Sequence, residues 1–204
     1  MPNTPILTLA CECSDTVAAY LVGEVPPLVE RIRKLMYRGT ESAQLKQNGT
    51  RTKLYEMGAD PATSEWLNAT ESNTIPVHEF GFYRYVLDVG GRSGTTWSAL
   101  SNKLRMGSLV FKVESGYADW WHKGLDAGVH YVSVEEDLSN LHEMYLWAEN
   151  NPEAVAQIAE AGRAYAVEAR SKQSMDAHLR RVATRMQDTG ANCSLSLPPR
   201  LHFV

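Results

Sequence analysis

The sequence predicts an α/β fold, namely a Rossmann-like parallel sheet with flanking helices and a helical C-terminal part. Strand patterns and helical patterns alternate along the first two thirds of the chain, which is typical of a parallel sheet covered on both faces. Residues 83–115 have the order strand, glycine-rich turn, helix, strand. From Asp137 the apolar residues recur at helical spacing, so the last part of the chain is expected to be helical.

Short apolar runs bounded by turn-forming residues predict the strands. The strand that leads into the glycine-rich turn carries Tyr85, Val86, Leu87 and Val89. Four further runs predict strands at residues 5–10, 35–39, 108–113 and 129–134. The polar segment 41–76 predicts only a short helix or strand near residues 53–57.

Apolar residues spaced three or four positions apart predict the helices. An amphipathic segment, residues 28–35, follows the Pro26-Pro27 pair. Asp137 or Ser139 is expected to cap the first helix of the C-terminal part. The helices expected after the glycine-rich turn region are residues 118–125, 138–148, 153–168 and 174–187, and residues 189–204 are expected to form a tail.

The length and the charge narrow the class of protein. The 204 residues suffice for one ordinary domain or one lobe of a larger enzyme. The formal net charge is −4 and the basic residues are scattered, so no nucleic-acid partner is expected. No stretch approaches the roughly twenty apolar residues of a membrane span, and residues 1–5 lack the pattern of a signal peptide.

The cysteine and histidine positions favour neither a disulfide scaffold nor a metal site. Cys11, Cys13 and Cys193 are too few and too irregular for a zinc site, although one disulfide bridge remains possible. The histidines show no ligand spacing, so no metal is expected. Three N-glycosylation sequons, which begin at residues 48, 68 and 192, suit a secretory-pathway protein or arise by chance.

The glycine-rich turn is the best candidate for a phosphate site. Gly90, Gly91 and Gly94 allow the backbone to approach a ligand, and Thr95 or Thr96 can cap the helix that follows. The N-terminus of a helix presents unpaired N–H groups and a partial positive charge, which favour an anion. The glycine spacing matches neither the dinucleotide-binding pattern nor the Walker pattern.

Several short motifs in a fixed order resemble the capsule-associated, Rumi-like glycosyltransferases, which include protein O-glucosyltransferases and fungal capsule xylosyltransferases. The resemblance covers about residues 34 to 166. The motifs are Tyr37-Arg38-Gly39-Thr40, Tyr83-Arg84-Tyr85-Val86-Leu87-Asp88, the glycine turn with Trp97, Gly107-Ser108-Leu109-Val110-Phe111-Lys112, Glu114-Ser115, Trp120-Trp121, Val129-His130-Tyr131-Val132, Asp137-Leu138, Trp147-Ala148 and Ile158-Ala159-Glu160-Ala161-Gly162.

The resemblance implies the C-terminal, nucleotide-sugar-binding lobe of a two-lobed GT-B glycosyltransferase. Residues 1–33 would then be a remnant of the upstream lobe or a linker, residues 34–188 the donor-binding domain and residues 189–204 the tail. The implied reaction transfers glucose or xylose, with inversion, from a UDP-sugar to a hydroxyl group of a protein or glycan, with no further cofactor. The implied compartment is the secretory pathway, in the lumen of the endoplasmic reticulum or Golgi.

The resemblance also assigns the candidate donor-binding residues. Arg38, with Gly39 and Thr40, is expected to contact the diphosphate. The turn is expected to supply a second contact through Gly91, Arg92, Ser93, Gly94, Thr95 and Thr96. Glu114, after a strand, is expected to accept a hydrogen bond from a ribose or sugar hydroxyl. The family's arginine after the aromatic residue of the turn is replaced by Ser98, for which Arg92 or Lys103 could compensate.

No catalytic base can be named in this sequence. Asp88 is expected to cap the turn rather than to act as a base. Trp120 and Trp121 are expected to pack in the core rather than to stack on a ligand. Two alternatives therefore stay open: a catalytically incomplete donor-binding fragment, and a dinucleotide-dependent oxidoreductase in which Glu114 would bind the ribose.

Overall fold

The computed structural model describes residues 25–40, 49–72, 77–90 and 98–188. The chain divides into two compact units, Met1–Val167 and Glu168–Val204. The short helices are η1 (Leu28–Glu30), α2 (Thr50–Ala59), α3 (Val77–Phe80), α4 (Ser98–Arg105) and η2 (Trp120–Gly124). The strands are β1 (Ile32–Gly39), β2 (Leu67–Glu71), β3 (Tyr83–Asp88), β4 (Leu109–Val113) and β5 (Val132–Val134), and the C-terminal helices are α5 (Leu141–Asn150), α6 (Pro152–Ala169) and α7 (Lys172–Asp188).

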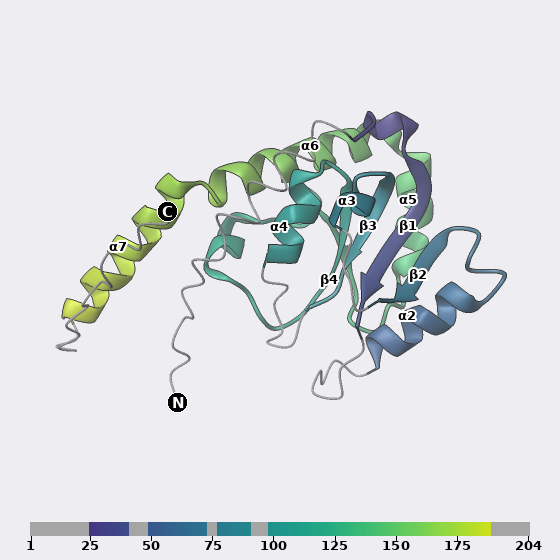
Figure 1. Cartoon of the computed structure of the whole chain (residues 1–204), viewed down its shortest axis with the longest axis horizontal. Coiled ribbons are helices and arrows are strands. Elements are labelled where there is room, and N and C mark those ends of the chain that lie inside the picture. The colour runs from purple at the N-terminus through teal and green to yellow at the C-terminus, as the bar shows by residue number, and fades with distance from the viewer. Residues whose placement is uncertain (1–24, 41–48, 73–76, 91–97, 189–204) are drawn as a thin grey trace, which may run out of the picture. The chain divides into compact units, whose positions relative to one another are not determined.

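The five strands form one sheet in the order β2-β1-β3-β4-β5, and every neighbouring pair is parallel (Figure 1). The predicted parallel α/β fold is therefore confirmed. One edge strand, β2, lies in the polar segment 41–76, for which the sequence predicts only a short helix or strand near residues 53–57. It belongs to the sheet because Leu67 pairs with Leu35 and Ala69 pairs with Tyr37.

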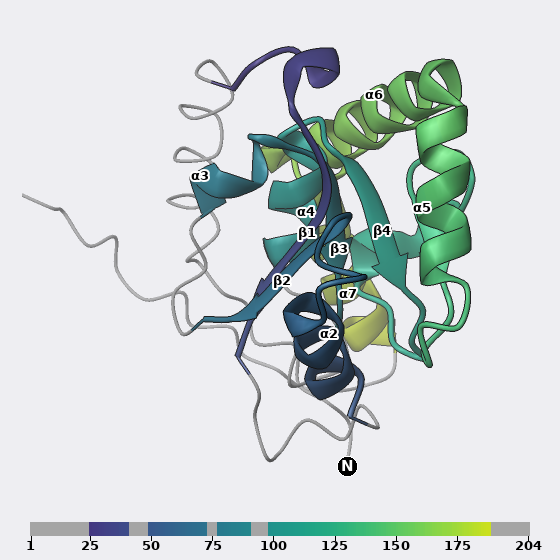
Figure 2. The ribbon, with the colours of Figure 1, turned by 90° about the vertical axis from the view of Figure 1, so that its right-hand side faces the viewer.

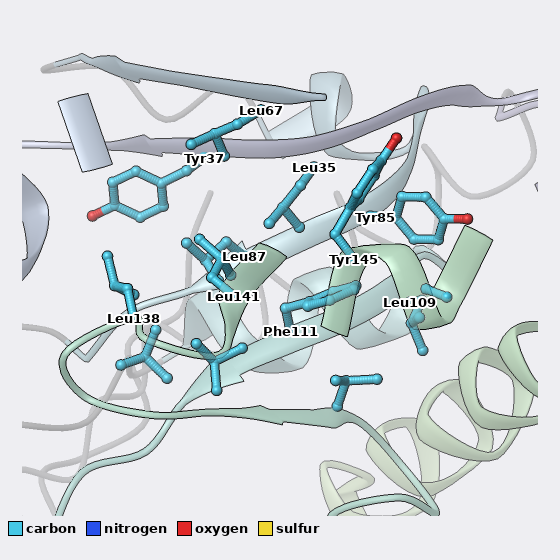
Figure 3. Close-up of a cluster of buried hydrophobic side chains, with 14 of the residues drawn as sticks. Leu35, Tyr37, Leu67, Tyr85, Leu87, Leu109, Phe111, Leu138, Leu141 and Tyr145 are labelled. Atoms are coloured by element: carbon cyan, nitrogen blue, oxygen red, sulfur yellow. The ribbon is translucent and has the colours of Figure 1, made fainter. Parts of the chain in front are cut away.

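The two faces of the sheet carry different side chains, because successive residues of a strand point to opposite sides. One face is covered by α5 and α6, and α3 and α4 lie on the opposite side (Figure 2). Leu35, Leu87 and Phe111 point to the α5 side, where they pack with Leu141 and Tyr145 in one buried apolar cluster (Figure 3). The buried residues Met36, Val86 and Val110 alternate with them and point to the α3 and α4 side.

Three predicted elements differ in extent from the observed ones. The amphipathic segment 28–35 is not one helix: only the single turn η1 forms, and β1 starts at Ile32 because the Ile32 N–H donates to the carbonyl of Phe82. The aromatic segment 118–125 forms the 3-10 helix η2. The last strand starts at Val132 rather than Val129, since His130 N–H bonds the Asp126 carbonyl and closes a turn before it.

The C-terminal helices form as predicted, but the first has a different cap. Helix α5 starts at Leu141 with Asn140 as its N-cap residue, so the predicted cap at Asp137 or Ser139 is wrong. The Asp137 carboxylate accepts a hydrogen bond from Ser139 N–H, and Leu138 has a positive φ of 63°. These contacts form a turn that precedes the helix. Helices α6 and α7 confirm the other two predicted helices within a few residues.

Candidate functional site

The carboxyl ends of all five strands meet at one edge of the sheet, because the strands are parallel. Open α/β sheets bind their ligands at this edge. The predicted site residues Arg38, Gly39 and Thr40 lie at the end of β1, and Glu114 directly follows β4. The structure therefore places both groups of described candidates at the edge where a ligand is expected.

Arg38 is held at one of its three side-chain nitrogens. Its Nη1 donates to the carbonyl of Tyr37 at 2.9 Å and to that of Asn68 on β2 at 2.8 Å. Nε and Nη2 donate to none of the residues that the structure describes. A guanidinium group in this state keeps donors for an oxyanion while its position is fixed by the backbone.

Gly39 and Thr40 shape the backbone next to Arg38. A Cβ atom at Gly39 would lie 2.4 Å from the hydroxyl oxygen of Tyr37, so only glycine fits without a shift. The Gly39 carbonyl accepts hydrogen bonds from the Tyr55 hydroxyl at 2.9 Å and from Ser72 N–H at 2.7 Å. The Thr40 hydroxyl donates to the Ser72 carbonyl at 2.9 Å. The end of β1 is thus tied to α2 and to the end of β2.

Arg51, which the sequence did not single out, joins the ends of two strands. It lies in the first turn of α2, and its Nη1 donates to the Thr40 carbonyl at 2.6 Å while its Nη2 donates to the Gly90 carbonyl at 2.7 Å. Thr40 follows β1 and Gly90 follows β3, so one guanidinium group fixes the spacing between the candidate residues of β1 and the start of the glycine-rich turn. No local motif marks Arg51, because its partners are distant in the sequence.

Polar residues form a row across the face of the sheet that points towards α3 and α4. Asp88 of β3, Lys112 of β4 and Ser133 of β5 are direct neighbours in the strand register. The Asp88 carboxylate forms a buried ion pair with Lys103 Nζ of α4 at 2.8 Å, and Lys103 also donates to the Leu87 carbonyl. Lys103 is thus buried against the protein's own carboxylate rather than placed at a ligand, and Asp88 has a partner other than the turn.

Glu114 is fixed by three hydrogen bonds. Its Oε1 accepts from the Tyr131 hydroxyl at 3.0 Å and from the Ser133 hydroxyl at 2.9 Å, and its Oε2 accepts from Lys112 Nζ at 2.8 Å. Burial opposes ionisation, but the hydrogen bond and charge of Lys112 and the two hydroxyl bonds outweigh it, so the pKa of Glu114 is lowered. The carboxylate is therefore ionised at neutral pH, and Oε2 retains capacity for one more donor.

The second predicted phosphate contact lies outside the described residues. This applies to Gly91, Arg92, Ser93, Gly94, Thr95 and Thr96, and their expected role stays a prediction. The flanking residues are described: Gly90 accepts the hydrogen bond from Arg51, and α4 begins at Ser98. The turn therefore starts at the same edge of the sheet as Arg38 and Glu114.

The aromatic and histidine residues near η2 have structural contacts. Trp121 is buried, as expected for a packing residue. The Nδ1 atoms of His122 and His130 accept hydrogen bonds from the backbone N–H groups of Asp119 and Asp126. Within the described ranges, no three His, Cys, Asp or Glu side chains are grouped so that they could hold a metal ion. In the same part of the chain, no helix has the length and apolar character needed to cross a membrane.

The parallel sheet and its flanking helices define a Rossmann-like α/β domain. Residues 18–180 match Glycosyl transferase family 90, and the chain belongs to this family. The motif order that suggested the capsule-associated, Rumi-like enzymes is thereby confirmed.

Curated relatives match shorter segments of the chain. The chain is 33% identical over 92 residues to Protein O-glucosyltransferase 2 of Danio rerio. This matched segment covers 45% of this chain and 18% of that protein. It is 38% identical over 80 residues to O-glucosyltransferase LpsA of Dichelobacter nodosus, or 37% of this chain and 24% of that protein. It is 34% identical over 85 residues to human Protein O-glucosyltransferase 3, and this match covers 41% of this chain and 17% of that protein. The matched segments thus span less than a quarter of each of these relatives.

Proposed function

We propose that the chain is the donor-binding part of a glycosyltransferase that uses a UDP-sugar, with glucose or xylose as the transferred sugar. The acceptor would be a hydroxyl group of a protein or glycan. Family membership supports the reaction class, and the relatives, which are named O-glucosyltransferases, favour glucose. The observation that carries the proposal is the position of Arg38, which lies at the carboxyl edge with two nitrogens not engaged by the described residues.

The proposed mechanism uses these residues to stabilise the leaving group. The acceptor oxygen attacks C1 of the sugar, the bond from C1 to the UDP oxygen breaks with its electron pair on UDP, and a base takes the acceptor proton. Arg38 and the turn after Gly90 would hold the growing charge of the diphosphate. Arg51 would keep these two elements at a fixed distance. Glu114 would accept a hydrogen bond from a hydroxyl group of the ribose or sugar.

A second candidate is a module that binds the donor without turning it over. This candidate is favoured because no catalytic base is assigned among the described carboxylates at the site. Asp88 is buried in an ion pair, and Glu114 is held by three hydrogen bonds. Hydrolysis or transfer assays with UDP-glucose distinguish the two candidates. The compartment proposed for either is the secretory pathway. Of the three sequon asparagines, the described one, Asn68, lies in β2 and its Nδ2 donates to the Tyr83 hydroxyl, so this sequon does not support the compartment.

Calorimetric titration with UDP, with NAD as the control ligand, tests the proposal. We expect UDP to bind and NAD not to bind. Arg38→Ala should weaken UDP binding by roughly 10- to 150-fold, because a hydrogen bond to a charged group contributes about 1.5–3 kcal/mol. The matched control is Arg33→Ala, at the other end of the same strand, where the arginine is exposed and pairs with Glu149.

Two results would contradict the proposal. Binding of NAD without competition from UDP would favour the oxidoreductase alternative. A change of less than about twofold in the UDP affinity of Arg38→Ala would remove Arg38 from the phosphate site.

A further inference from the structure

A second arginine, Arg31, lies at the opposite, amino edge of the sheet, where the strands begin. It directly precedes β1 and is only 7% exposed. Its Nε donates to the Pro26 carbonyl at 2.8 Å, and its Nη1 donates to the Met106 carbonyl at 2.9 Å and to the Ser108 hydroxyl at 3.0 Å. Ser108 is fully buried, and its hydroxyl group donates a hydrogen bond that is shared between the carbonyls of Tyr83 and Phe80. Arg31 is therefore firmly held at this edge.

The charge of Arg31 is not balanced by a carboxylate among the described residues, since its three bonds go to two carbonyls and one hydroxyl. Burial lowers the pKa of Arg31, and no nearby acid raises it. Buried charges in proteins are normally paired, because an unpaired one loses its hydration without compensation. The third nitrogen, Nη2, donates to no described residue. Arg31 thus retains both a positive charge and an unused donor.

Arg31 borders a cavity of about 410 Å³ that a second arginine, Arg163 of α6, also lines. The two side chains converge over Gly107, which has a positive φ of 68°. A Cβ atom there would lie 3.5 Å from Arg163 Cδ and 3.9 Å from Arg31 Nη2. The one carboxylate among the described lining residues is that of Glu160, which accepts two hydrogen bonds from Arg163 at 2.7 and 2.8 Å. The charged lining residues therefore leave one positive charge in excess.

The remaining described wall of the cavity is apolar. It includes Pro27, Leu28, Met106, Ala156 and Ala159. A cavity of this size is within the range of small-molecule sites. Its chemistry suits a ligand with two parts, namely an oxyanion for the arginines and an apolar body for the wall.

We propose that this cavity binds a small organic anion, a carboxylate or phosphate group carried on a short apolar body. The oxyanion would accept hydrogen bonds from Arg31 Nη2 and from Arg163, and the apolar body would lie against Leu28, Met106 and Ala159. The site is separate from the candidate donor site, because β1 runs from Ile32 near one to Gly39 at the other, a distance of roughly 20 Å for an extended strand. The proposal does not depend on the proposed glycosyltransferase function.

Titrations of the full chain with acetate, butyrate and hexanoate test whether the cavity binds a ligand with an anionic group and an apolar body. We expect the affinity to rise by up to about fourfold for each added methylene group, because each one removes apolar surface from water. Hexanamide, which has the same tail and no charge, should not bind. Hexyl phosphate compared with inorganic phosphate distinguishes the two head groups. Backbone NMR shifts should change at Gly107 and Ala159, and saturating UDP should leave hexanoate binding unchanged.

Variants locate the site. Arg163→Gln removes one cation from an exposed position and should weaken hexanoate roughly three- to tenfold, as expected for a partly solvated charged bond. Ala156→Leu fills the cavity mouth from the exposed side of α6 and should weaken hexanoate while inorganic phosphate is less affected. Arg180→Gln on α7 is the matched control and should change nothing. Arg31→Lys keeps a cation but loses the fork of donors, and a thermal melt shows whether that variant is folded.

Three outcomes would overturn the inference. The first is binding of hexanamide as tightly as hexanoate, which would show a merely apolar pocket. The second is an unchanged hexanoate affinity in both Arg163→Gln and Ala156→Leu. The third is displacement of hexanoate by UDP, which would place the anion at the carboxyl edge instead.

Discussion

The two faces of the sheet bury different kinds of side chain. On the side of α5 the inward residues of β1, β3 and β4 form an apolar cluster that reaches the carboxyl ends of the strands, with Leu35, Leu87 and Phe111 fully buried. On the side of α3 and α4 the buried apolar residues Met36, Val86 and Val110 are each followed two positions later by a charged residue, namely Arg38, Asp88 and Lys112. The hydrophobic effect stabilises a fold without requiring specific partners, because it is not directional. Buried polar groups, by contrast, are tolerated only where each has a hydrogen-bond or charge partner. The face on the side of α3 and α4 therefore has fewer apolar contacts near the carboxyl edge, where the proposed ligand lies.

The largest expected effect comes from breaking the buried ion pair on the polar face. Lys103→Met leaves the Asp88 carboxylate, only 2% exposed, without its cation. We expect the free energy of unfolding to fall by about 3–5 kcal/mol. The measurement is urea unfolding at pH 7. The double variant Asp88→Asn/Lys103→Met should recover most of the loss, and a loss of under about 1 kcal/mol in the single variant would mean that the pair is not buried as described.

A truncation on the apolar face should cost almost as much in stability but leave the site intact. Leu87→Ala removes a fully buried side chain from the cluster of Figure 3. A decrease of about 2–5 kcal/mol in the free energy of unfolding is expected from the lost transfer energy and the cavity. The UDP affinity of the folded fraction should stay unchanged. Val129→Ala, at a residue that is 51% exposed, is the control.

Removal of the bridge between the ends of β1 and β3 should have an intermediate effect on stability and a specific effect on the site. Arg51→Ala abolishes the bonds to the Thr40 and Gly90 carbonyls, and the free energy of unfolding should fall by about 1.5–3 kcal/mol. Tyr55→Phe removes one neutral bond at the same edge, to Gly39, and is the matched control. We expect calorimetry to show a larger loss of UDP affinity in Arg51→Ala than in Tyr55→Phe. Equal losses would show that Arg51 has no special part in holding the site.

The smallest effect is a dependence on pH through Glu114. Because its pKa is lowered in the folded chain, its ionised form stabilises the fold above the ordinary glutamate pKa, and this contribution is lost as the pH falls through the lowered value. Its side chain is 39% exposed, so the contribution should be less than about 1 kcal/mol. Urea unfolding of Glu114→Gln and the unaltered chain should differ at pH 7 and converge towards pH 3. A difference that grows on acidification would contradict the assignment.

The sequence predicted those features that depend on neighbouring residues. The apolar run before Gly90 and the one after Gly107 became adjacent strands, since short buried strands are marked by their own composition. Strand β2 was missed because Leu67-Asn68-Ala69-Thr70-Glu71 has little apolar pattern and forms a strand through its pairing with β1. Arg51 was missed for a related reason: its partners are 11 and 39 positions away. The family motifs made Arg38 and Glu114 candidate site residues, and their role stays a prediction. Their hydrogen-bond partners on other strands could not be predicted from spacing alone.

The wholly parallel order of the sheet also has a consequence for how the chain folds. Met36 of β1 pairs with Val86 of β3, about fifty positions later, and each neighbouring pair of strands is joined through a crossover rather than a hairpin. Contacts between residues so distant in sequence must close long loops before they contribute stability, and domains dominated by such contacts fold slowly. During synthesis β1, which is an inner strand whose two neighbours β2 and β3 both follow it in the sequence, cannot be paired until they have been made. Until then its apolar side chains are exposed to other chains.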